Sequence, residues 1–192
     1  MILRNFYVGI QSAIAQNTDD TYGKIQLNNG SFSNATPNSI IGTYYYNNQT
    51  LLEKEYLQGS KSLANSGFVL GSDDKEVTIE DYTIKPLNAD LTVTFLKDKF
   101  NIIRNIEEHK ITTIRAWSIT NTSTTLAVDV KEIGAYSSTN DNTRCLIWRE
   151  TLKDKSFTLQ PLQAGTFTMT MEYDLVNYSN PLSAVNFISE VK

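Results

Sequence analysis

The sequence predicts an all-β protein: an antiparallel β-sandwich, of jelly-roll-like or Ig-like type, with an irregular N-terminal arm or subdomain. Thr, Ser and Asn together make up 56 of the 192 residues. Thr favours strands, whereas Asn and Ser favour turns. Short segments of alternating apolar and polar residues recur from residue 67 onward. No long helical pattern separates these segments, which is typical of an antiparallel sandwich.

The clearest strand covers residues 166–173. Here an apolar set alternates with a polar set. The predicted inward set is Phe167, Met169, Met171 and Tyr173, and the predicted outward set is Thr166, Thr168, Thr170 and Glu172. A period of two places alternate side chains on opposite faces of a sheet, so the apolar set should point into the core.

A second long strand is predicted over residues 111–120, with Thr113, Arg115, Trp117 and Ile119 on one face. Trp117 is expected in the core, as is Trp148 on a later strand. The remaining predicted strands are 68–70, 77–84, 90–96, 126–131 and 145–150.

The chain divides into three predicted parts: an arm or subdomain over 1–66, the sandwich over 67–176, and a C-terminal tail over 177–192. The first part lacks sustained alternation. Its opening fits either a short strand or a helical turn, and a short helix is predicted over 50–57.

Aromatic residues in the first part are too numerous for a disordered tail. We therefore expect this part to form an interface with other subunits; a local subdomain packed on its own sandwich is the alternative. The interface candidates are Phe6, Tyr7, Tyr44, Tyr45 and Tyr46. Tyr suits both protein interfaces and sugar binding.

Composition excludes several classes. The net charge is −4 with no basic run, which argues against a protein that binds nucleic-acid phosphates. One His and one Cys allow neither a zinc site of His and Cys ligands nor a disulfide within one chain. The start does not read as a secretory leader, and no apolar stretch is long enough for a membrane span.

No catalytic arrangement rises above background, so we predict a protein that is not an enzyme and needs no cofactor. Cys145 lies in a strand pattern, far in sequence from the single base His109. It is predicted to be a buried structural residue. The acidic residues Asp73, Asp74 and Glu76 are expected to form a solvated loop, so no metal site is predicted, and a calcium site there is the weak alternative.

Several segments resemble parts of tailed-bacteriophage structural proteins, in the same order and with the same spacing. The resemblance covers about 105 residues. Its segments are Gly67–Ser72, Val77–Ile84, Ser118–Ser123, Val130–Tyr136, Leu146–Leu152 and Phe157–Gly165. Departures from the family pattern are Ala135 in place of leucine and a longer turn over 162–165.

This resemblance implies a non-enzymatic, multi-copy virion component that assembles with copies of itself and with other virion proteins. It would be made in the host bacterial cytoplasm. The tail, baseplate or connector region is favoured over capsid decoration. A receptor- or carbohydrate-binding module at a tail tip or fibre, contacting a host surface glycan, is the alternative.

Two positions in the resembling segments suggest specific contacts. Gly134 follows Glu132 and Ile133 on a predicted strand, which suits a bulge or a close backbone approach. Arg149 on another strand predicts a carboxylate partner, and Glu132 is the expected one.

Overall fold

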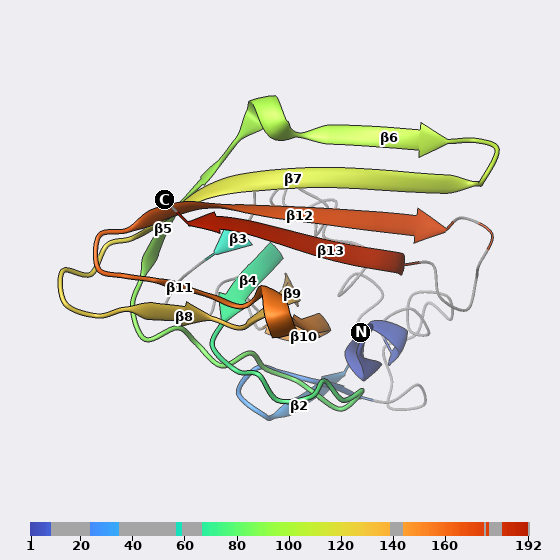
Figure 1. Ribbon diagram of the computed structural model, residues 1–192. Helices are drawn as coiled ribbons and strands as arrows, with labels where there is room; N and C mark the ends of the chain where they lie inside the picture. Colours follow the sequence, from blue (N-terminus) through green and yellow to red (C-terminus); the bar gives the residue numbers. More distant parts are fainter. Residues whose placement is uncertain are drawn as a thin grey trace.

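Two β-sheets form the framework of the computed structural model, which describes residues 1–8, 24–34, 57–58, 67–138, 144–174, 176 and 182–191. The strands of the large sheet are β5 (Leu91–Phe95), β6 (Asn101–Asn105), β7 (Lys110–Asn121), β12 (Ala164–Asp174) and β13 (Leu182–Val191). Their order is β13-β12-β7-β5, and β6 also pairs with β7 (Figure 1). All these pairs are antiparallel.

The strands β5 and β6 share one side of β7. The first pairs with residues 117–121 and the second with residues 110–114. The short 3-10 helix η2 (Lys97–Lys99) joins them. Together they form one border of the large sheet.

The small sheet has the order β10-β9-β4-β3. Its strands are β3 (Leu57–Gln58), β4 (Gly67–Gly71), β9 (Glu132–Ser138) and β10 (Arg144–Thr151). The pair β3–β4 is parallel and the others are antiparallel. Short elements complete the described chain: a helical turn at 4–8, β1 (Lys24–Gln26), β2 (Phe32–Asn34), β8 (Val128–Val130), η3 (Lys153–Lys155) and β11 (Phe157–Leu159).

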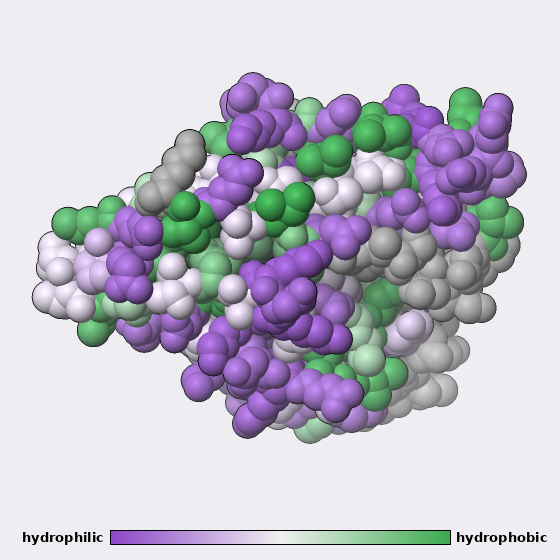
Figure 2. Space-filling model, in the orientation of Figure 1, coloured by the Kyte–Doolittle hydropathy of each residue, from purple (hydrophilic) through white to green (hydrophobic). Residues whose placement is uncertain are grey.

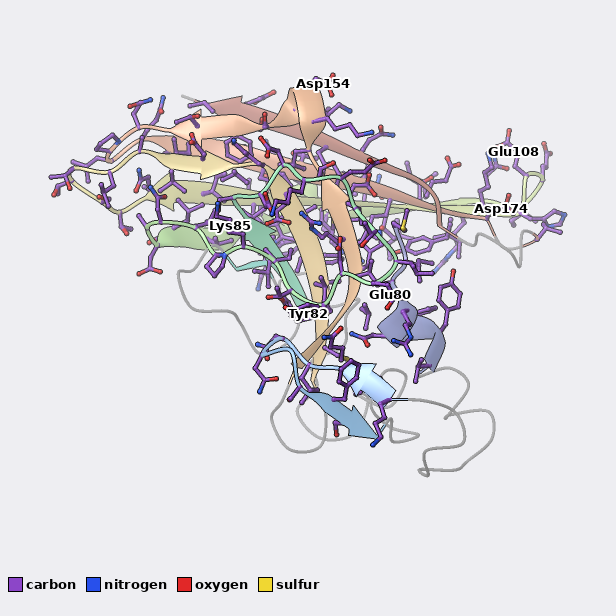
Figure 3. All side chains as sticks on the ribbon, turned by 90° about the horizontal axis from the view of Figure 1, so that it is seen from below. Glu80, Tyr82, Lys85, Glu108, Asp154 and Asp174 are labelled. Carbon is purple, nitrogen blue, oxygen red and sulfur yellow. The ribbon has the colours of Figure 1, made fainter. Side chains whose placement is uncertain are left out.

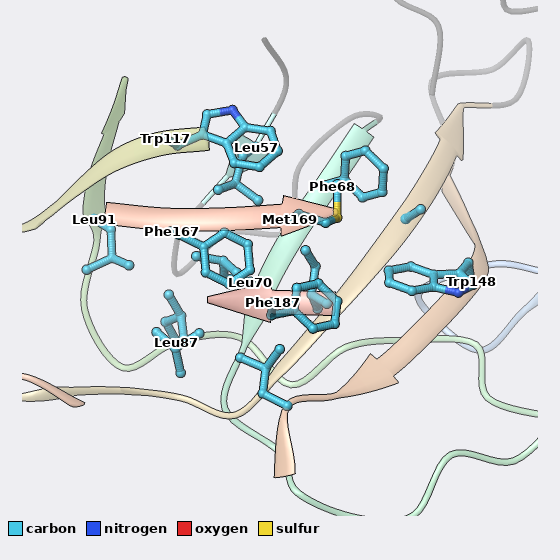
Figure 4. Close-up of a cluster of buried hydrophobic side chains, with 14 of the residues drawn as sticks. Leu57, Phe68, Leu70, Leu87, Leu91, Trp117, Trp148, Phe167, Met169 and Phe187 are labelled. Carbon is cyan, nitrogen blue, oxygen red and sulfur yellow. The ribbon is translucent and has the colours of Figure 1, made fainter. Parts of the chain in front are cut away.

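The main core contains side chains from both sheets (Figure 4). From the large sheet, Phe167 packs against Trp117 and Phe187, with ring centroids 6.2 and 5.7 Å apart. From the small sheet come Phe68 and Trp148, whose rings meet edge to face. The all-β class is therefore confirmed, whereas the jelly-roll-like and Ig-like types stay predictions.

The predicted register of β12 is confirmed. Phe167, Met169 and Met171 are buried, and Tyr173 is partly buried against the same cluster. The threonines between them are half-buried on the other face of the sheet. The period of two was sufficient to predict which side chains of β12 are buried, because the large sheet packs one face against the core.

The predicted face of β7 is also buried, including its arginine. The Nη1 of Arg115 donates to Oγ1 of Thr113 at 2.7 Å, and its guanidinium lies 6.0 Å from the ring centroid of Phe68. Burial lowers the pKa of Arg115, and Tyr173 acts in the opposite direction.

The tail predicted for 177–192 needs correction. Residues Leu182–Val191 form β13, which pairs along most of β12. Phe187 is buried in the main core. The sequence around it carries apolar residues at both odd and even positions, so its period of two is obscured.

The strand predicted over 77–84 also needs correction, because this segment is irregular. Asp81 accepts hydrogen bonds from both the backbone N–H and the hydroxyl of Thr78, and its own N–H donates to the Thr78 carbonyl. Such a side-chain turn competes with strand pairing.

Several described residues of 1–66 pack on the chain's own core, whereas the expected interface with other subunits stays a prediction. Val8, Ile25, Leu27 and Leu57 belong to the main core. These residues show no regular period in the sequence, yet their side chains are buried in the main core. The described part therefore agrees with the alternative, a subdomain packed on its own sandwich.

Candidate functional site

The outward face of the small sheet is covered by residues 72–87, which we call the strap. Figure 3 looks towards this side of the molecule, with Glu80, Tyr82 and Lys85 labelled along the strap. Its Ile84 is fully buried. This side chain belongs to a second hydrophobic cluster, separate from the main core, with Leu3, Val69, Tyr136 and Leu146.

Two glycines allow the strap to lie close to the sheet. A Cβ at Gly134 would overlap Cδ1 of Ile84, and a Cβ at Gly71 would overlap Cγ2 of the same side chain. Of the two alternatives predicted for Gly134, a bulge or a close approach, the structure shows a close approach, made by the side chains of Ile84 and Leu146. Ile84 fills the space that both missing side chains leave.

Replacing Gly134 by alanine is expected to lower the free energy of unfolding by about 1–3 kcal/mol, because the new methyl group overpacks this site. The change Ile84→Val removes the overlapping Cδ1 atom, so the double variant should recover part of the loss. Urea titrations of the single and double variants measure this. A fully additive loss would contradict the proposed contact.

The strap is also held by a buried arginine. Arg149 of β10 donates from Nε to Oε2 of Glu132 and from Nη1 to Oδ2 of Asp81, each at 2.6 Å. A third carboxylate, Asp73, lies 3.9 Å from Nη2. The predicted pair of Arg149 with Glu132 is confirmed, whereas the contact with Asp81 was not predicted.

Glu132 ties both ends of the strap to the sheet. Its Oε1 accepts the backbone N–H of Asp73 at 3.1 Å and that of Lys85 at 2.9 Å. Nearby, the hydroxyl of Tyr136 accepts the N–H of Ile84 and donates to Oγ1 of Thr83. The strap is therefore bonded to β9 through side chains instead of through strand pairing.

In this cluster the guanidinium of Arg149 faces three carboxylates, those of Glu132, Asp81 and Asp73. Burial lowers the pKa of Arg149, but its bonds to Asp81 and Glu132 outweigh burial and raise it. Burial raises the pKa of Glu132, and the donors around it act against that rise. Burial would raise the pKa of Asp81, yet the bonds from Arg149 and Thr78 lower it. We call Arg149, Glu132 and Asp81, together with the bonds from Glu132 to the strap, the clamp.

The predicted calcium candidate gains no support from this geometry. Asp73 faces Arg149, and Asp74 lies 3.0 Å from Nζ of Lys131. The bond from Lys131 lowers the pKa of Asp74. Within the described ranges, no group of three or more His, Cys, Asp or Glu side chains could hold a metal ion.

Cys145 is fully buried in the main core, as predicted. Burial raises the pKa of its thiol to about 12. A nucleophilic cysteine requires the opposite shift, towards thiolate at neutral pH. His109 lies in the β6–β7 turn with a left-handed backbone (φ 55°).

Changing Cys145 to alanine is expected to cost only about 1 kcal/mol of stability, because it removes one small buried atom. The native protein should also resist a small thiol reagent that labels the urea-unfolded protein fully. Labelling within seconds under native conditions would contradict the burial of Cys145.

The predicted interface aromatics are divided by the structure. Phe6 is partly buried against the main core, and Tyr7 is 45% exposed beside it. Their rings meet edge to face at 5.9 Å. The three consecutive tyrosines, Tyr44, Tyr45 and Tyr46, lie outside the described residues.

No helix of the described chain has the length and apolarity to cross a membrane.

The strand β6, the most exposed one in the described part of the chain, was not predicted from the sequence. All five of its residues are exposed, and Ile102 and Ile103 are exposed by 45 and 48%. Ile106 in the following turn is 82% exposed. Two adjacent isoleucines between Asn101 and Arg104 show neither strand alternation nor a helical period, so only the β-rich composition favoured a strand here.

No protein-family model, curated protein or solved structure matches this chain.

Proposed function

We propose that this protein is a non-enzymatic structural component of a tailed-phage virion and acts through protein–protein assembly. A place in the tail, baseplate or connector region is favoured over capsid decoration. The proposal starts from the resembling segments between Gly67 and Gly165.

One observation carries the proposal: two charged residues within the resembling segments, Glu132 and Arg149, hold the fold. Glu132 and Arg149 are buried, bonded to each other, and bonded to the strap. A buried, paired charge of this kind offers no activated nucleophile or free general base to a substrate. Such a scaffold suits a protein whose task is to be assembled.

The exposed surface supports the same role. Large apolar side chains that are 45% or more exposed lie on β6 and in the turn after it. Contiguous exposed apolar side chains often mark protein interfaces. Assembly through strand edges would use this surface without any change of the clamp.

The direct test is the composition of purified particles. Particles from the host that carries this gene should contain the chain in many copies by quantitative mass spectrometry, and gold-labelled antibody should bind near the tail or neck. If the chain is expressed but absent from particles, the proposal is overturned. Specific hits on a glycan array would instead favour the receptor- or carbohydrate-binding alternative.

A further inference from the structure

We propose that two copies of this chain join through the edges of their β6 strands, so that their large sheets form one continuous antiparallel sheet. The inference adds a partner to the proposed assembly function, and the biological role of the dimer rests on that function. Its physical basis is separate: the open side of β6, its exposed isoleucines, and the charges at its two ends.

The edge formed by β6 is open. The strand pairs with β7 on one side, and no second partner strand is present in the described chain. By contrast, the N-terminus covers the β10 edge of the small sheet, where the Leu3 N–H donates to the Ile147 carbonyl and the Arg149 N–H to the Met1 carbonyl. An open edge presents backbone donors and acceptors to a further strand.

This edge lacks the usual features that block pairing. Proteins protect edge strands with proline, bulges or several charges. The segment Asn101–Asn105 has no proline and pairs with β7 without a register shift. Its single charge is Arg104. Figure 2 shows hydrophobic side chains over β6, between hydrophilic groups at either end.

The charges at the ends of β6 fit a second copy of the same strand. Lys99 precedes the strand, and Glu107 follows it. In an antiparallel pair of identical strands centred on Ile103, residues equally far from the centre lie opposite each other. Lys99 ends η2 and Glu107 lies in the turn after β6, so the two flank the paired strands. An antiparallel pair brings the start of one copy's strand beside the end of the other's, which places the basic residue of one copy near the acidic residue of the other, twice.

The same register places apolar residues together. Ile103 meets its own symmetry mate. The side chain of Arg104 lies opposite Ile102, over which its carbon stem can extend. No residue of β6 meets a like charge directly across the pair. This match of charge and apolar residues is why we commit to a second copy as the partner.

Five residues of edge pairing bury little surface, so the dimer should be weak in dilute solution, with a dissociation constant on the order of 100 μM. High local concentration in a larger assembly would raise its occupancy. This is the behaviour expected of a part that stays separate until many copies gather.

Disulfide trapping tests the register. The full chain with Ile103→Cys should form a covalent dimer under mild oxidation by copper phenanthroline, because opposite residues in antiparallel strands lie within disulfide reach. The native Cys145 is fully buried and does not compete. The matched control is Ile188→Cys, on β13 of the same sheet and 60% exposed.

Sedimentation equilibrium tests the energetics. Ile103→Lys places like charges opposite each other and should weaken self-association at least about tenfold, whereas Ile188→Lys should not change it. Lys99→Glu should weaken it by about two- to tenfold. Adding Glu107→Lys to Lys99→Glu should restore it, because the two charges are exchanged.

Two results would overturn the inference: a monomer at all concentrations up to about 1 mM, or trapping through residue 188 but not through residue 103. Particle composition separates these outcomes from the proposed function. A chain that is present in virions but does not trap at residue 103 leaves the proposed function standing and removes the β6 dimer. A trapped dimer that is absent from virions does the reverse.

Discussion

Replacing Arg149 by methionine is expected to lower the free energy of unfolding by about 3–5 kcal/mol. Glu132 is fully buried, and Arg149 is its cationic partner in the clamp. The change leaves this carboxylate buried without its counter-charge, and Asp81 loses its 2.6 Å ion pair. Methionine keeps much of the side-chain volume, so the loss reports on charge more than on packing. Urea unfolding followed by circular dichroism measures it.

Two variants control for this result. Arg104→Met removes an arginine on the exposed strand β6 and should change stability by less than about 0.5 kcal/mol. The double variant Arg149→Met with Glu132→Gln should be more stable than Arg149→Met alone, because it removes the unpaired charge. If the single and double variants are equally unstable, the clamp does not act through charge.

Replacing Phe167 by alanine is expected to cost about 3–5 kcal/mol, because a fully buried ring is removed from a site that cannot collapse easily. Its ring lies against those of Trp117, Phe157 and Phe187. These neighbours come from three different strands, so no single side chain can move to fill the cavity.

The matched control for Phe167 is the neighbouring Thr168, which is half-buried on the other face of β12. Thr168→Ala should change stability by about 0.5 kcal/mol or less. Urea unfolding of both variants gives the comparison. A larger loss at Thr168 than at Phe167 would show that β12 has the opposite register.

Much of the candidate site was predictable from local sequence. Gly134 on a strand predicted a close approach, and Arg149 on another strand predicted a carboxylate partner. Both predictions concern neighbouring strands, β9 and β10, which pair along their length. The role of Asp81 was not predictable, because its contact with Arg149 joins positions 68 residues apart.

Strands with a strict period of two, such as β12, were identified from residue order alone, since one buried face demands that pattern. The strap, β13 and the described N-terminal residues lack that pattern. Only the tertiary structure placed them: Ile84 is buried because Gly71 and Gly134 make room for it. Burial there depends on contacts between distant parts of the chain, and no local period records such contacts.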